Sequence, residues 1–157
     1  MKPVALILAA VLLFTGIHPA AAQHPDEPTV SQKIGRKQFV FVAQTVLPLR
    51  SMVRQISGLY ELRISGDSVL ADLPYFGRAY SAPMDMTGGG IRFTSVKNAY
   101  TVKNRKKGGW DIAIRINEPN DVRELNLSVF PNGTASLRVT STNRDPISFN
   151  GFIATGR

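Results

Sequence analysis

The segment from Leu73 to Pro83 holds the densest group of side chains that could bind a ligand. Within it, three aromatic residues and one arginine stand between two prolines: Tyr75, Phe76, Tyr80 and Arg78. Aromatic rings offer flat apolar surfaces, and a guanidinium donates a fork of hydrogen bonds to a carboxylate, a phosphate or a sugar hydroxyl. We predict either a rigid binding surface here or a plug, in which the rings close one end of the fold and Arg78 bonds buried carbonyls.

A second candidate site is a cluster of basic residues. No acidic residue lies between Asp85 and Asp111, and four basic residues crowd one turn in that interval: Lys103, Arg105, Lys106 and Lys107. A cationic hairpin tip attracts anionic lipid headgroups or acidic glycans. The alternative is a solvated turn that keeps a sheet edge from pairing with another chain. Nucleic acid is not an expected partner, because no aromatic residues interleave with these cations.

The sequence lacks the residues of the common catalytic sites. It contains no cysteine, and its two histidines, His18 and His24, stand near the start. Nucleophile–base pairs of the serine or cysteine hydrolase kind therefore cannot form in the rest of the chain. The acidic residues are scattered singly, without the spacing of a metal site. We predict a protein that is not an enzyme and that uses no cofactor or metal, although two strands could still bring a carboxylate pair together.

The first residues have the pattern of a secretory signal peptide. Lys2 precedes an apolar stretch from Val4 to Phe14, and small residues lead to a cleavage site between Ala22 and Gln23. The alternative is a retained membrane anchor. No cysteine follows the cleavage site, so we expect no lipid anchor, and no later segment is apolar enough to span a membrane. We predict an exported protein, periplasmic or extracellular, and the lack of disulfides favours a bacterial envelope.

The remainder divides into a lead-in and one domain. Residues 23–37 are polar and contain prolines, which predicts a disordered lead-in with room for one helical turn. Residues 38–157 are predicted to form a single domain, because apolar and polar residues alternate between turn signals such as Gly66-Asp67 and Asn132-Gly133. The expected strands are Phe39–Leu47, Tyr60–Ser65, Val69–Leu73, Ile91–Phe93, Tyr100–Val102, Trp110–Ile116, Leu125–Val129, Leu137–Val139 and Ile147–Ile153.

These strands predict an all-β fold. Short connections between successive strands favour an antiparallel meander of about eight strands, curled into a barrel or half-barrel that is lipocalin-like in outline. A sandwich of two sheets is the alternative. One segment competes with this pattern, because Leu49, Met52, Val53 and Ile56 follow Pro48 at helical spacing and predict a short amphipathic helix.

Four motifs resemble a known family. The segments 66–69, 73–80, 89–93 and 141–151 are similar to motifs of domain of unknown function 4251, an uncharacterised exported family of Bacteroidetes-type bacteria. The resemblance extends from Phe39 to Ile153, and the stretch from Arg50 to Ser57 departs from it by being apolar and basic. It implies a small exported β-rich protein, without an activity or a ligand.

The resemblance also makes Arg78 and Arg144 motif residues. If both point into one barrel mouth, they form a small anion or carboxylate site with Asn143 and Asn150 nearby. Alternatively, each caps carbonyls at strand ends or pairs with Asp72 or Asp145.

We therefore expect a binding protein whose unknown small-molecule ligand lies at one barrel end, near Tyr75, Phe76, Arg78, Tyr80 and Arg144. The rival is an envelope-associated interaction protein that binds an anionic component through its basic hairpin.

Overall fold

Strands make up most of the part of the chain that the structure describes. The computed structural model describes residues 29–80 and 89–154; the predicted signal peptide, with Ala22 and Gln23, lies outside this part. The elements are α1 (Val30–Gly35), β1 (Gln38–Pro48), β2 (Arg54–Gln55), β3 (Glu61–Ser65), β4 (Ser68–Leu73), β5 (Ile91–Ser95), β6 (Asn98–Asn104), β7 (Trp110–Ile116), β8 (Val122–Val129), β9 (Thr134–Ser141) and β10 (Ile147–Ile153).

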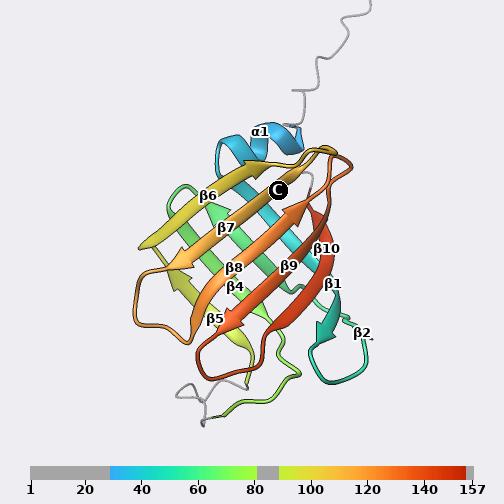
Figure 1. The fold of residues 1–157 in the computed structure, drawn as a ribbon, viewed down its shortest axis with the longest axis vertical. Coiled ribbons are helices and arrows are strands. Elements are labelled where there is room, and N and C mark those ends of the chain that lie inside the picture. Colours follow the sequence, from blue (N-terminus) through green and yellow to red (C-terminus); the bar gives the residue numbers. More distant parts are fainter. Residues whose placement is uncertain (1–28, 81–88, 155–157) are drawn as a thin grey trace, which may run out of the picture.

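Nine of these strands follow one continuous antiparallel path. Its order is β5-β4-β3-β1-β10-β9-β8-β7-β6, and the short β2 pairs with β1 beside it. Figure 1 shows the front strands β6–β10 crossing the back strands β1 and β3–β5. The first long strand pairs with the last, Phe41 opposite Ile153, so the barrel is closed except for a seam between β5 and β6. The predicted all-β antiparallel barrel is confirmed, with nine strands.

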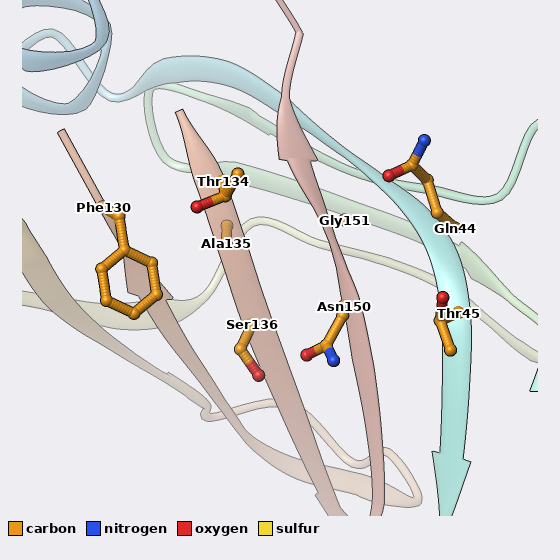
Figure 2. Close-up of a pocket in the computed structure, with 8 residues that line it drawn as sticks. All are labelled: Gln44, Thr45, Phe130, Thr134, Ala135, Ser136, Asn150 and Gly151. Atoms are coloured by element: carbon orange, nitrogen blue, oxygen red, sulfur yellow. The ribbon is translucent and has the colours of Figure 1, made fainter. Parts of the chain in front are cut away.

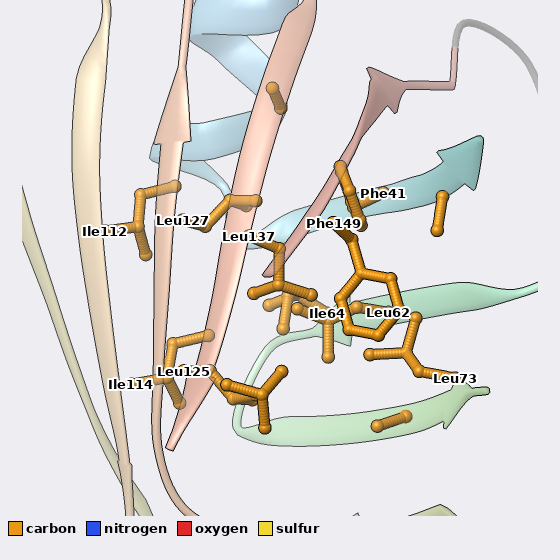
Figure 3. Packing of buried hydrophobic residues seen from close by; sticks show 14 of the residues in the cluster. Phe41, Leu62, Ile64, Leu73, Ile112, Ile114, Leu125, Leu127, Leu137 and Phe149 are labelled. Carbon is orange, nitrogen blue, oxygen red and sulfur yellow. The ribbon is translucent and has the colours of Figure 1, made fainter. Parts of the chain in front are cut away.

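Apolar side chains from both halves of the barrel meet inside it. Phe41 on β1 and Phe149 on β10 are fully buried, and in Figure 3 they lie near Leu62 and Leu73 from the back strands. Isoleucines and leucines of β7, β8 and β9 complete this cluster from the front. Burial of such side chains contributes about 1.5–3 kcal/mol each, so the filled interior is the main source of stability.

The lead-in over residues 23–37 was predicted to be disordered, with room for one helical turn; residues 29–37 are ordered instead, and the short helix α1 forms there. Helix α1 begins at a capping box, in which the Thr29 side chain accepts from the Gln32 backbone and the Gln32 side chain accepts from the Thr29 backbone. Ile34 is buried in the core, and Lys33 donates to the Ala154 carbonyl at 2.9 Å. Tertiary packing therefore orders a helix too short to be stable alone. Residues 23–28 lie outside the described part.

The predicted helix after Pro48 does not form. The chain there turns back, and β2 pairs with β1 through Gln55 opposite Thr45. Leu49, Met52 and Val53, which were expected on one helical face, are all exposed. Of the four residues of the predicted face, Ile56 alone packs against the core, so helical spacing was insufficient without a surface to cover the other three.

Two buried hydroxyls lie at the seam. Ser95 on β5 and Tyr100 on β6 each place a side-chain oxygen out of contact with water, without a hydrogen-bond partner. The Tyr100 ring also lies 5.2 Å from the Lys37 ammonium. Burial raises the pKa of Tyr100 from 10.0 to about 12. An uncompensated hydroxyl costs stability, so the seam is the least well satisfied part of the barrel.

Replacing Tyr100 by Phe tests this arrangement. At neutral pH the variant is expected to match or exceed the parent in free energy of unfolding, by about 1 kcal/mol, because the orphan hydroxyl is gone. From pH 10, where the phenol of the unfolded chain ionises, to about 12, the parent loses stability because the unfolded chain releases the proton first. The variant should lose less over this interval. Urea unfolding followed by Trp110 fluorescence measures both effects.

Substitution of Gly151 tests the closure of the barrel. A Cβ on Gly151 would lie 1.9 Å from the Val42 carbonyl oxygen across the β1–β10 pair, so backbone would have to move. Gly151→Ala is expected to lower the free energy of unfolding by about 3 kcal/mol. Gly35→Ala is the control, because nothing lies within 4 Å of its added Cβ and alanine favours helix. Equal stability of the two variants would contradict this account.

Candidate functional site

Two motifs that are far apart in the sequence meet at one barrel end. Ala79, in the aromatic segment, forms an isolated antiparallel bridge with Arg144, in the turn between β9 and β10. The Tyr80 amide donates to the Asn143 carbonyl at 2.8 Å, and the Asp145 amide donates to the Arg78 carbonyl at 3.0 Å. The structure therefore brings together the predicted site residues of both motifs.

The Tyr75 side chain stabilises this bridge between the two motifs. Its hydroxyl lies 2.6 Å from the Arg78 carbonyl oxygen and 3.1 Å from that of Asp145, and donates to both. Burial, followed by the negative charge of Asp145, raises the pKa of Tyr75. A Cβ on Gly77 would lie 2.5 Å from the same hydroxyl, so a glycine is needed for the ring to take this position. Tyr75 thus serves the fold.

Arg144 is also committed to internal partners. Its Nε lies 2.9 Å from the Asp121 carboxylate, and its Nη1 donates to the carbonyls of Gly90 at 2.9 Å and Gly89 at 3.3 Å. Its guanidinium lies 5.3 Å from the Tyr75 ring centroid, and only 12% of the side chain is exposed. Of the expected roles, Arg144 takes that of capping carbonyls. Its acidic partner is Asp121, which sequence reasoning did not single out.

Asp145 links this buried network to the surface. The residue is only 6% exposed, accepts a 2.5 Å hydrogen bond from the Tyr80 hydroxyl, and has the Arg50 guanidinium at 3.5 Å. The hydrogen bond to Asp145 is the main cause that raises the pKa of Tyr80. The buried Asp145 carboxylate therefore holds the exposed Tyr80 ring in position through the Tyr80 hydroxyl.

The remaining side chains of this end face solvent. Phe76, Arg78 and Tyr80 are exposed, and the Arg54 guanidinium lies 5.3 Å from the centroid of the Phe76 ring. Arg54 and Arg50 connect these residues to the turn after β1. We call the exposed residues of this region the barrel-end surface: Leu49, Arg50, Met52, Val53, Arg54, Phe76, Arg78 and Tyr80. In the sequence, the apolar and basic character of residues 50–57 was the signal that could have pointed to this surface. It did not show that these residues lie beside the aromatic segment.

The basic hairpin lies at the other end of the barrel, where β6 and β7 join near α1 (Figure 1). Arg105 folds back there, with its guanidinium 4.8 Å from the Phe130 ring centroid and 3.6 Å from the Asp111 carboxylate. Lys103, Lys106 and Lys107 remain exposed. Three of the four predicted surface-contact residues are therefore available to a partner.

A groove crosses the outer face of the barrel over β1, β10 and β9. It has a volume of about 350 Å³. Figure 2 shows the side chains that line it, among them Gln44, Thr45, Phe130, Thr134, Ser136 and Asn150. Asn150 was expected beside Arg144 in the barrel mouth; it lies instead on this outer face. Sequence reasoning did not predict the groove, because its lining comes from three strands and a turn.

A sequence model of the family described as Domain of unknown function (DUF4251) matches residues 21–153. The chain belongs to this family. A solved DUF4251 family protein from Bacteroides eggerthii DSM 20697 has a similar fold, with a TM-score of 0.55 and 12% identity over 78% of this chain and 82% of that one. No curated protein matches the sequence.

Two kinds of feature are absent from the part of the DUF4251 chain that the structure describes. Among its described residues, no group of three or more histidine, cysteine or acidic side chains is placed to hold a metal ion. In the same part of the chain, no helix is long and apolar enough to cross a membrane.

The two arginines of the motifs are expected to differ in their effect on stability. Arg144→Ala leaves two glycine carbonyls without this donor and the Asp121 carboxylate with the Asn143 amide but no cation, and should lower the free energy of unfolding by about 3 kcal/mol. Arg78→Ala removes an exposed side chain and should change it by less than about 0.5 kcal/mol. Thermal and urea unfolding compare the variants, and a larger loss for Arg78→Ala would contradict the assignment.

Proposed function

We propose that this DUF4251 protein is an exported, non-catalytic binding protein that engages an anionic, amphiphilic component of the bacterial envelope through the barrel-end surface. The supporting observation is the exposure of neighbouring large apolar side chains on one turn: Leu49 is 56%, Met52 83% and Val53 60% exposed. Soluble proteins rarely expose large contiguous apolar patches, and those that occur mark interaction sites.

The charge of this surface specifies the kind of partner. Arg50, Arg54 and Arg78 accompany the apolar side chains, so the surface combines cations with residues that gain from leaving water. Arginine and aromatic side chains favour the boundary between headgroups and acyl chains, where anionic lipids hold basic residues by about 1 kcal/mol each. A bilayer surface that carries anionic headgroups supplies both complementary features.

The buried half of the same motifs keeps this surface in place. Tyr75 and Arg144 fix the backbone of residues 78–80 against the turn before β10, and Asp145 orients the Tyr80 ring. Arg54 lies over Phe76 in the same way. A surface held before binding loses less conformational entropy when it binds, which supports a binding role for the exposed residues.

Export and a non-catalytic role are proposed from the sequence. The segment up to Ala22 has the pattern of a signal peptide, and the protein contains no cysteine. A partner in the envelope is the natural consequence of export.

The basic hairpin is the second candidate, favoured by the exposure of Lys103, Lys106 and Lys107. It offers mainly cations, with Val102 and Phe130 only partly exposed beside them, so its attraction to an anionic surface would be mainly electrostatic and would fall steeply as salt is raised. The two candidates lie at opposite barrel ends (Figure 1) and can be separated by mutation.

Cosedimentation with phosphatidylglycerol-containing vesicles tests both candidates. The proposal expects binding that exceeds binding to pure phosphatidylcholine vesicles and that partly persists at moderate salt. Replacing Leu49, Met52 and Val53 by Ser should weaken binding at least about tenfold, since each buried side chain contributes more than about 1 kcal/mol. Replacing Lys103, Lys106 and Lys107 by Gln is the matched control and should weaken it much less. The reverse order would assign binding to the hairpin, and no binding would overturn both.

A further inference from the structure

We propose that the outer groove over β1, β10 and β9 is a second binding site, for a neutral polyhydroxylated ligand such as a sugar chain. This inference is independent of the barrel-end surface, because the two use different residues. The volume of the groove, about 350 Å³, lies at the lower end of the range for small-molecule sites. The groove can therefore hold a small ligand or a short section of a longer one.

The closure of the barrel produces this hollow. The register between β1 and β10 shifts between Ala43 and Thr45, which is a β-bulge in the middle of the pair. Beside it, the Val42 carbonyl comes so close to Gly151 that no side chain fits there. The next strand places the small Ala135 opposite Gly151. Ala135 is itself buried in the core and Gly151 carries no side chain, so neither places a side chain in the groove, and bulges often mark functional positions.

Polar side chains follow one another across the groove in a regular row. Thr45 is opposite Asn150, and Asn150 is opposite Ser136. Paired positions of neighbouring strands place their side chains about 5 Å apart. An extended ligand that lies across the strands would therefore meet a hydrogen-bonding group at each step.

These polar groups are available to a ligand. Within the described part of the chain, the side chains of Gln44, Ser136 and Asn150 make no hydrogen bond, and Thr45 donates to Gln55 but keeps its acceptor capacity. The barrel-end motif is different in this respect, because Tyr75, Arg144 and Asp145 use their polar groups inside the protein. Two amides and one hydroxyl without internal partners can donate and accept at once, as a ligand with many hydroxyls requires.

The lining also sets the charge of the ligand. Among the residues that the structure describes, no acidic or basic side chain lines the groove. Two cations stand at its border: Arg105 lies on Phe130 and is paired with Asp111, and the exposed Arg138 lies two residues beyond Ser136 on the same face of β9. The described lining thus suits a neutral ligand, whereas an anion would need to reach Arg138 at the border. Phe130 adds a partly exposed ring at the border, and an aromatic face of this kind can pack against the apolar face of a sugar.

A peptide is a poorer fit for this groove. Peptides commonly bind a sheet by adding a strand to a free edge, whereas β1, β10 and β9 all lie inside the strand path with a partner on each side. Their backbone groups are already paired. Binding at this place must rely on the side chains, and their amides and hydroxyls match a polyol.

The test is isothermal titration calorimetry of the full protein with neutral hexasaccharides: maltohexaose, cellohexaose and laminarihexaose. Binding of at least one is expected, and Asn150→Ala should weaken it at least about tenfold, a loss of about 1.4 kcal/mol of binding free energy. Asn126→Ala is the matched control, because Asn126 is an exposed asparagine on the neighbouring strand β8. It should change the affinity by less than about twofold.

Three outcomes would overturn the inference. The first is the absence of binding by all three oligosaccharides at millimolar concentration. The second is an equal effect of the two asparagine substitutions, which would place binding elsewhere. The third is preferential binding of heparin, an anionic polysaccharide, in a manner that depends on Asn150. Thermal unfolding of both variants ensures that they are compared as folded proteins, and vesicle binding should be unchanged by Asn150→Ala.

Discussion

The pairing of β1 with β10 is the constraint on which the rest of the structure depends. It joins the first long strand to the last, from Phe41 opposite Ile153 to Pro48 opposite Ile147. Without it, β3–β5 and β6–β9 would be two separate sheets, each with an uncovered apolar face. Because this contact spans almost the whole domain, the core cannot close until both ends of the domain are in place, as expected of a fold with a high contact order.

Both proposed sites follow from this one pair of strands. At its lower end in Figure 1, β1 runs past the core into the exposed turn from Leu49 to Val53, while the residues before β10 hold the aromatic segment. Near its middle, the bulge lies beside the outer groove. The two surfaces differ in chemistry. One combines arginines with apolar side chains, and the other is neutral and carries hydroxyls and amides, so they favour different partners.

Internal hydrogen bonding separates the structural residues from the candidate binding residues. Tyr75, Arg144 and Asp145 belong to a satisfied network, and a buried polar group without a partner would cost stability there. The exposed Phe76 ring makes no such contribution to the fold. Nor does the Asn150 side chain, which makes no hydrogen bond in the described part of the chain. The aromatic motif divides in the same way: Tyr75 packs against the core at the barrel end, and Phe76 faces solvent beside Arg54.

The sequence by itself determined the strands, their antiparallel order and the family, because period-two alternation and turns such as Asn132-Gly133 are local signals. It predicted disorder where α1 forms, and it predicted a helix at Leu49–Ile56 where none forms. Whether either segment is helical depends on whether a distant apolar surface covers it. The sequence also could not name Asp121 as the partner of Arg144 or bring Thr45, Ser136 and Asn150 into one groove. Only the tertiary structure decided these, because closing the barrel fixes which residues of distant strands become neighbours.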